Sequence, residues 1–264
     1  MSPAAEIRGQ APTGVEHAPL ALDVDDLTGP AGSPIVRHVS ITLPRGATHV
    51  VLGPMHSGKS LLLRLILSLQ RSEHGTVTID GTSCDAAAPN DDQLRRVRRK
   101  VGVLFESSAL VSRLTLLENV ELPLVEHTTM DATAARDKAS ELLREVGVEA
   151  DIELTPELVS RLDRRRAALA RALVLEPPLL LIDEPGHGLD ADAATELDDT
   201  LRALQHRYGC AALICSQEVR YAFRSPDDVS VLAGGRVVDH GDLDHLRQSR
   251  LEAVRRFVDR RGAA

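Results

Sequence analysis

The stretch Gly53-Pro54-Met55-His56-Ser57-Gly58-Lys59-Ser60 matches the pattern GxxxxGK[ST]. In this pattern, backbone N–H groups and the start of the next helix point at phosphates, the lysine reaches the β- and γ-phosphates, and the final hydroxyl ligates Mg²⁺. A chance glycine-rich turn is the alternative, but the flanking segments disfavour it. THVVL before the loop is typical of a strand, and SLLLRLILSLQ after it is typical of a buried helix. The stretch therefore predicts a nucleoside triphosphate site in an α/β domain.

A second motif supplies carboxylates. Leu179 to Ile182 is an apolar strand pattern that ends in Asp183 and Glu184. The first carboxylate is placed to hold Mg²⁺ through water and the second to orient and activate an attacking water. A surface acidic pair at an ordinary strand end is the alternative, which the phosphate-binding loop in the same chain disfavours. The two motifs together predict hydrolysis at a site that includes Lys59 and Ser60.

The rest of the chain alternates strand and helix patterns around a mainly helical stretch. We expect helices over 131–146, 164–175 and 191–208, and strands over 35–43, 48–52, 76–79, 101–105, 179–183, 211–216, 229–233 and 236–239. Strands that alternate with helices predict an α/β fold. The basic run 95–100 lies near Asp91 and Asp92, so we interpret it as a solvated face.

Composition excludes several functions. The 264 residues, 43% of them hydrophobic, suffice for one sizeable core. The net charge of −8 disfavours direct binding to nucleic acid or anionic lipid. No apolar run approaches the roughly 18 residues that cross a bilayer, and the three cysteines lack metal-ligand spacing. We therefore expect a cytoplasmic protein with reduced core thiols and a disordered tail over 1–18.

Several segments resemble the ATP-binding cassette (ABC) subunits of membrane transporters. The resemblance covers about residues 20–240 and rests on the order of the phosphate-binding loop, the helical insert, LLLIDEP and Gly188-Leu189-Asp190. The stretch 105–128, with NVELPLVEHT as its most specific part, the run RRAALARAL and Val254-Arg255-Arg256-Phe257 are similar to the ATPases of MCE (mammalian cell entry) lipid transport systems.

This resemblance implies a P-loop NTPase fold: a RecA-like core with an antiparallel β-subdomain and an inserted α-helical subdomain at about 108–165. The nucleotide-binding domain would span 19–245, with a C-terminal helical extension over 246–264. Two such subunits, expected to be a homodimer, bind ATP and Mg²⁺ head to tail, with Asp190 in the D-loop at their interface. Residues 106–126 would contact an integral membrane permease and hold the chain at the inner face of the membrane.

The sequence departs from that family at two positions expected to be catalytic. Glu106 replaces the Q-loop glutamine; it can ligate Mg²⁺, but an unpaired carboxylate facing the γ-phosphate costs roughly 1–4 kcal/mol. Gln217 replaces the switch histidine and keeps an N–H donor. His56 stands where the family has glycine, and we interpret it as a turn residue. No aromatic residue precedes Ile35 to stack on adenine, which leaves the choice between ATP and GTP open.

The signature segment is also altered. Ser160-Arg161-Leu162 occupies the place where the family uses a serine and two glycines to approach the neighbouring subunit's γ-phosphate. Ser160 contacts that phosphate in trans, or it caps its own helix through the pattern Ser160-x-x-Asp163. Arg161 could instead supply charge in trans, as an arginine finger does.

Two functions follow. In the first, the chain hydrolyses ATP, with reduced activity, and powers lipid or other hydrophobic-substrate transport. In the second, it is a regulatory or scaffolding subunit with weak or no turnover. A chromosome-organising or DNA-repair cassette is disfavoured because the sequence lacks a long coiled-coil insertion.

Overall fold

A six-stranded sheet forms the centre of the computed structural model, which describes residues 19–30, 36–224 and 226–260. The predicted tail 1–18 lies outside these residues. The sheet has the order β10-β9-β3-β8-β7-β6 and is parallel except for β10. Its strands are β3 (Thr48–Leu52), β6 (Val101–Leu104), β7 (Leu179–Asp183), β8 (Ala211–Ser216), β9 (Asp228–Ala233) and β10 (Arg236–Gly241).

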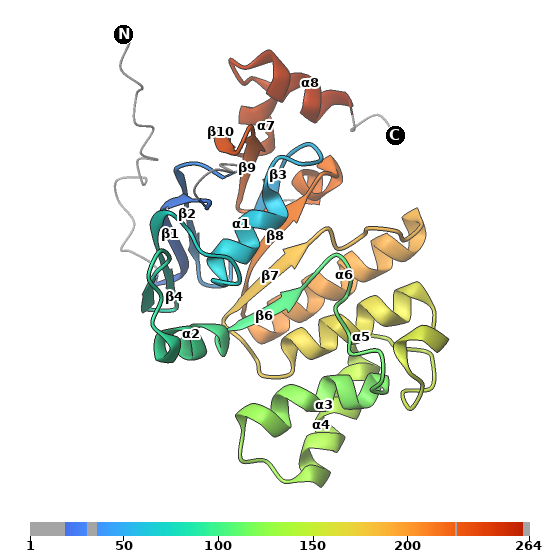
Figure 1. The fold of residues 1–264 in the computed structure, drawn as a ribbon. Coiled ribbons are helices and arrows are strands. Elements are labelled where there is room, and N and C mark those ends of the chain that lie inside the picture. Colours follow the sequence, from blue (N-terminus) through green and yellow to red (C-terminus); the bar gives the residue numbers. More distant parts are fainter. Residues whose placement is uncertain (1–18, 31–35, 225, 261–264) are drawn as a thin grey trace.

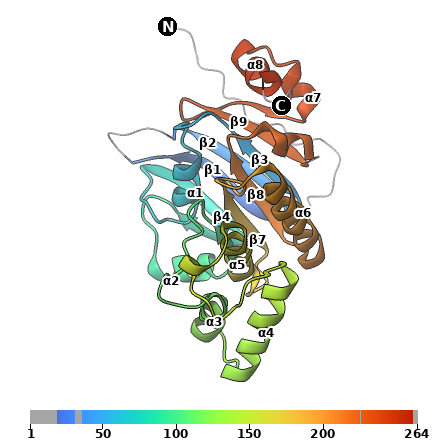
Figure 2. The ribbon, with the colours of Figure 1, turned by 90° about the vertical axis from the view of Figure 1, so that its right-hand side faces the viewer.

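Alternate side chains of this sheet enter two separate hydrophobic cores. In β7, Leu180 and Ile182 belong to the core that also holds α6 (Ala191–Tyr208), while Leu179 and Leu181 belong to the core that holds α1 (Lys59–Ile66). Figure 2 shows α1 and α6 on opposite sides of the sheet. Both faces are therefore covered, which explains why β7 is apolar at four consecutive positions.

A second, antiparallel sheet lies beside α1 and has the order β2-β1-β4-β5. Its strands are β1 (Leu20–Thr28), β2 (Val39–Pro44), β4 (His74–Ile79) and β5 (Thr82–Asp85), and α2 (Asp91–Arg98) follows them. The sequence analysis did not predict β1. Its register shifts against β2 between Val24 and Leu27, and this bulge interrupts the alternation by which a strand is recognised.

The helical insert contains α3 (Leu116–His127), α4 (Ala132–Glu145) and the 3₁₀ turn η1 (Pro156–Leu158), and Figure 1 shows α3 and α4 at one end of the molecule. A capping box starts α3: the Thr115 hydroxyl accepts from the Glu118 N–H and the Glu118 carboxylate accepts from the Thr115 N–H. The Asn119 side chain, fully buried, bonds both main-chain groups of Val111 and ties the preceding loop to this helix.

The remaining helical elements lie between the insert and β7, between β8 and β9, and after β10. They are α5 (Arg161–Leu173), η2 (Val219–Arg224), α7 (Leu243–Arg247) and α8 (Glu252–Arg260). Val254 and Val258 of α8 are buried in the same core as α6. Among the described residues, no helix is both long and apolar enough to cross a membrane.

The predicted α/β P-loop fold is confirmed, and most predicted elements match closely. The strands over 179–183 and 211–216 and the helix over 191–208 have the predicted bounds. The helix expected at 164–175 starts three residues earlier, because the cap is Ser160. Cys84, Cys210 and Cys215 are free and buried, in agreement with reduced core thiols.

We expect Asn119→Ala to lower the free energy of unfolding by about 1–3 kcal/mol, because the half-buried Val111 N–H and neighbouring carbonyl groups lose their partner, the fully buried Asn119 amide. Denaturant unfolding measures this change. Glu126→Ala, on the exposed face of the same helix, is the control and should stay within about 0.5 kcal/mol of wild type. Equal losses of unfolding free energy in the two variants would contradict the stabilising role that we assign to the Asn119 hydrogen bonds.

Candidate functional site

Four loops meet at one edge of the parallel sheet because each follows the carboxyl end of a strand. The loops after β6, β7, β8 and β3 begin at Phe105, Glu184, Gln217 and Gly53. Since β8 lies between β3 and β7, the loop after β8 is placed between the phosphate-binding loop and the carboxylate pair. Ligands of open α/β sheets bind at this edge.

The phosphate-binding loop requires glycine at its first position. A Cβ on Gly53 would lie 2.4 Å from the Leu232 carbonyl oxygen and 2.6 Å from the Ser57 hydroxyl, closer than side-chain carbons can approach. Lys59 Nζ donates to the carbonyls of Gly53 and Pro54 at 2.9 and 3.1 Å. These two bonds hold the Lys59 ammonium over its own loop, in a buried position beside the place where a β- or γ-phosphate would bind.

His56 and Met55 form the exposed tip of the loop. His56 has φ 63°, in the left-handed region that histidine occupies more often than most residues. This agrees with its interpretation as a turn residue. Gly58, at φ 107°, precedes the first turn of α1.

Ser57 Oγ and Asp183 Oδ1 are two of the four buried side-chain oxygens that lack a hydrogen-bond partner within the described part of the chain. Buried polar atoms without partners are uncommon in native proteins. Burial raises the pKa of Asp183, and the nearby carboxylates of Glu184 and Glu106 raise it further against a hydrogen bond from Ser60. A hydroxyl and carboxylates gathered in this way are the oxygen ligands that Mg²⁺ uses beside phosphates, so these residues fit that ion.

Glu184 has an unfavourable backbone conformation, and hydrogen bonds fix the orientation of its side chain. Its φ of 45° is unfavourable for a residue with a Cβ, and such conformations concentrate at functional sites. One carboxylate oxygen accepts from the Ser216 hydroxyl at 2.8 Å and the other from the Gln217 N–H at 2.9 Å. Lys59 Nζ lies 3.5 Å from the same carboxylate. Glu184 thus joins the loops after β3, β7 and β8.

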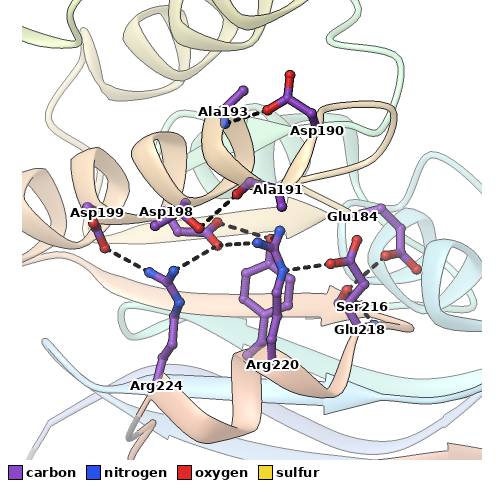
Figure 3. A network of polar contacts seen from close by, with 12 residues as sticks. Glu184, Asp190, Ala191, Ala193, Asp198, Asp199, Ser216, Glu218, Arg220 and Arg224 are labelled. Atoms are coloured by element: carbon purple, nitrogen blue, oxygen red, sulfur yellow. Dashed lines mark hydrogen bonds and ion pairs between the residues drawn. The ribbon is translucent and has the colours of Figure 1, made fainter. Parts of the chain in front are cut away.

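A chain of polar contacts continues from Glu184 into α6 (Figure 3). Ser216 Oγ accepts from the Glu218 N–H at 3.0 Å, and the Glu218 carboxylate lies 2.6 Å from Arg220 Nε. Arg220 in turn lies 3.5 Å from the carboxylate of Asp198, which is buried on α6. Burial raises the pKa of Asp198, and Arg220 opposes that rise. The segment after β8 is therefore fixed to α6 as well as to Glu184.

Glu106 has a partner that the sequence analysis did not foresee. Its carboxylate lies 3.3 Å from His187 Nε2, and both side chains are about half exposed. Glu106 is therefore not unpaired in this structure, because a histidine nitrogen lies within ion-pair distance of its carboxylate. Both residues line a pocket with Ser60 and Asp183, so Glu106 is placed near the predicted Mg²⁺ ligands.

The altered signature segment makes its contacts within the chain. Ser160 caps α5: its hydroxyl accepts from the Asp163 N–H at 3.0 Å and donates to the Asp163 carboxylate at 2.7 Å. Arg161 Nη1 donates to the Gly188 carbonyl at 2.5 Å, and Leu162 packs against the main core. The capping interpretation of Ser160 is thus confirmed, and Arg161 is tied to the D-loop segment of its own subunit. Asp190, at the end of that segment, caps α6 through the Ala193 N–H.

Arg165 is the site residue that the sequence analysis missed. This fully buried guanidinium donates to the carbonyls of Phe105, Glu184 and His187 at 2.7, 3.3 and 3.2 Å. It therefore links α5 to the loops after β6 and β7. Burial lowers its pKa, although guanidinium remains charged at neutral pH. In the sequence, Arg165 could have been identified only as an arginine that falls on the buried face of a predicted helix.

Comparison with known proteins agrees with this geometry. Residues 36–187 match the family model described as ABC transporter. The chain belongs to the ABC transporter family. It is an ATP-binding ATPase subunit of the kind that pairs with a membrane permease and forms dimers, and its resemblance to MCE-type ATPases is supported by its relatives.

Two curated relatives carry different substrate names. The chain is 35% identical over 243 residues, 92% of its length and 67% of the relative's, to the probable ribonucleotide transport ATP-binding protein mkl of Mycobacterium tuberculosis. It is 33% identical over 225 residues, 85% of its length and 83% of the relative's, to the intermembrane phospholipid transport system ATP-binding protein MlaF of Escherichia coli. Both names describe an ATP-binding protein in transport.

Solved structures of the family share this fold. A dimeric bacterial ABC transporter cassette superimposes with a TM-score of 0.75 at 28% identity, covering 84% of this chain and 98% of that one. A post-hydrolysis cassette bound to ADP and phosphate gives the same TM-score at 27% identity and the same coverage of both chains.

We expect Arg165→Lys to lower kcat of ATP hydrolysis by up to about 10²-fold with little change in KM. The compact ammonium of lysine lacks the planar fork by which Nη1 and Nη2 of Arg165 reach carbonyls on two loops, and a shift of about 1 Å in the Glu184 backbone misplaces its carboxylate. Steady-state phosphate release measures both constants. Arg166→Lys is the control, because Arg166 pairs with Glu196 on α6. A rise in KM alone would contradict a positioning role.

We expect Ser160→Ala to lower the free energy of unfolding by about 0.5–2 kcal/mol, and Ser160→Asn to retain stability. The Asn amide offers both an acceptor for the Asp163 N–H and a donor for the Asp163 carboxylate. Thermal unfolding measures the difference. If Ser160→Ala unfolds like wild type but prevents ATP-dependent dimer formation, the hydroxyl acts in trans instead.

Proposed function

We propose that this chain powers MCE-type transport of lipid or another hydrophobic substrate by ATP-driven closure of a homodimer, with reduced hydrolysis. The observation that carries the proposal is the meeting of Lys59 and Glu184 beside the unpartnered Asp183 oxygen. The phospholipid system named for one relative supports the substrate class. We also propose the domain limits 19–245 and 246–264, with the helical subdomain at about 108–165.

Each site residue has a proposed role. The loop Gly53–Ser60 would cradle the phosphates, Lys59 would neutralise β- and γ-oxygens, and Ser60, Asp183 and Glu106 would hold Mg²⁺. Bound Mg²⁺ supplies charge stabilisation of the transferring phosphoryl group. Glu184 would orient and deprotonate water, with Gln217 as a donor near the γ-phosphate.

Reduced turnover is proposed from the contacts of Glu184. Its carboxylate accepts from Ser216 and Gln217, and Lys59 also lies near it. Both carboxylate oxygens therefore already accept hydrogen bonds that an attacking water would have to replace. Activation of water therefore requires that nucleotide and the second subunit redirect this side chain.

We propose two partners, a second copy of this chain and a membrane permease, from the positions of the residues and from the family to which the chain belongs. A second copy would present Ser160, Arg161 and Leu162 to the phosphates, and Asp190 would lie at the dimer interface. A permease would contact residues 106–126, where Val125 is 62% exposed. This contact would hold the chain at the inner face of the membrane.

A second candidate function rests on the contacts of the signature segment. Ser160 caps its own helix and Arg161 bonds its own Gly188 carbonyl, so both are satisfied without a partner subunit. A regulatory or scaffolding subunit that binds ATP without significant turnover would have these features. The measured rate with the permease decides between the two functions.

We expect Glu184→Gln to lower phosphate release by about 10²–10⁴-fold and to trap an ATP-bound dimer, because the general base is lost while phosphate binding remains. Phosphate release with the permease and size-exclusion chromatography with ATP measure the two effects. Glu252→Gln, on the exposed face of α8, is the control and should behave as wild type. Equal phosphate release by wild type and Glu184→Gln would exclude the motor and favour the regulatory subunit.

A further inference from the structure

Two histidines and an aspartate gather on the antiparallel sheet, outside the nucleotide site. Asp26 lies in β1, His38 directly precedes β2, and His74 begins β4. One ligand atom from each side chain lies within 4.8 Å of the other two. Three strands thus contribute a single metal-binding atom each to one point on the surface.

The distances approach those of a metal site. His74 Nε2 lies 3.5 Å from one Asp26 carboxylate oxygen, and His38 Nδ1 lies 2.7 Å from the other. Ligands about 2.0–2.2 Å from a tetrahedral ion are separated by about 3.3–3.5 Å. The two distances involve different Asp26 oxygens, but one ligand atom from each of the three side chains lies within 4.8 Å of the other two, so small side-chain rotations suffice to reach this spacing.

The backbone directs these side chains toward one another. Asp26 and His38 have φ 50° and 52°; Asp26 lies where the register between β1 and β2 shifts, and His38 directly precedes the pair Leu27–Val39 that follows the shift. Gly75 permits the bulge, because a Cβ there would lie 2.7 Å from Leu27 Cα and 2.9 Å from the Asp26 carbonyl oxygen. The Asp26 N–H donates to Ser40 Oγ and the His38 N–H to Thr28 Oγ1, both at 3.0 Å. The positions of Asp26 and His38 are therefore fixed by main-chain contacts independent of the His–Asp contacts.

The donor set selects the class of ion. Imidazole nitrogens suit Zn²⁺ and the neighbouring first-row metals, whereas Mg²⁺ and Ca²⁺ prefer oxygen ligands. The side chains of Asp26, His38 and His74 are 53, 51 and 43% exposed, which leaves room for water as a fourth ligand. Three protein ligands with one open position form a common zinc arrangement.

We propose that Asp26, His38 and His74 form a Zn²⁺-binding site that joins β1, β2 and β4. The site is separate from the Mg²⁺ ligands Ser60 and Asp183. Bound Zn²⁺ stabilises the antiparallel sheet, because it binds the folded arrangement and not the unfolded chain.

Zinc titration of the tag-free, nucleotide-free full chain in excess Mg²⁺, against a chromophoric chelator, tests the site. We expect one equivalent bound and a higher melting temperature with Zn²⁺ than with chelator. His74→Gln and Asp26→Asn should each weaken binding by more than the roughly 10–100-fold that loss of an outer-shell partner costs. Asn tolerates the left-handed backbone of position 26, so the second variant tests the ligand without adding strain.

His206→Gln, on the exposed face of α6, is the matched control and should bind Zn²⁺ as wild type does. Circular dichroism in chelator establishes that each variant is folded. Absence of Zn²⁺ binding to the folded wild type overturns the proposal and leaves Asp26 and His38 as a simple ion pair. Equal binding by wild type, His74→Gln and Asp26→Asn also overturns it, because the ion would then be held elsewhere.

Discussion

The order of the parallel sheet is the constraint on which the rest of the site depends. Because β8 lies between β3 and β7, Ser216 and Gln217 emerge between the phosphate-binding loop and Glu184. The main chain then connects these segments directly: the Gly53 N–H donates to the Ser216 carbonyl and the Glu184 N–H to the Cys215 carbonyl. Lys59 and Glu184 approach to 3.5 Å as a result of strand order, although 124 intervening residues include the entire helical insert.

Buried polar groups set the precision of this arrangement. Arg165 donates to three carbonyls on the loops after β6 and β7, and the contacts from Ser216 through Arg220 to Asp198 anchor the segment after β8 on α6. Each of these groups would be costly if left alone in a region of low dielectric. A continuous set of polar contacts therefore connects Glu184 to α5 and α6.

The sequence was sufficient to predict the fold and to place Lys59 and Glu184 on loops that the sheet brings together, because strand–loop–helix patterns are local in the chain. The capping of α5 by Ser160 was also local and predictable. The pairing of Glu106 with His187 was not, since 80 intervening residues separate two side chains that only the sheet order brings together. Arg165 was missed for a related reason: its partners are main-chain carbonyls, which have no sequence signature. β1 was not predicted because its bulge interrupts the alternation of apolar and polar residues that is typical of a strand.

The exchanges at the γ-phosphate end share one physical consequence. Glu106 pairs with His187, Arg161 donates to the Gly188 carbonyl, and the retained Ser160 bonds Asp163. Each of these groups thus has a partner inside its own subunit, and a dimer contact in trans has to compete with that partner. Because a ligand shifts an equilibrium only by its differential affinity for the two states, tight ATP binding at Lys59 does not by itself close the dimer. Closure depends on whether the interactions across the interface exceed those that each subunit already makes alone.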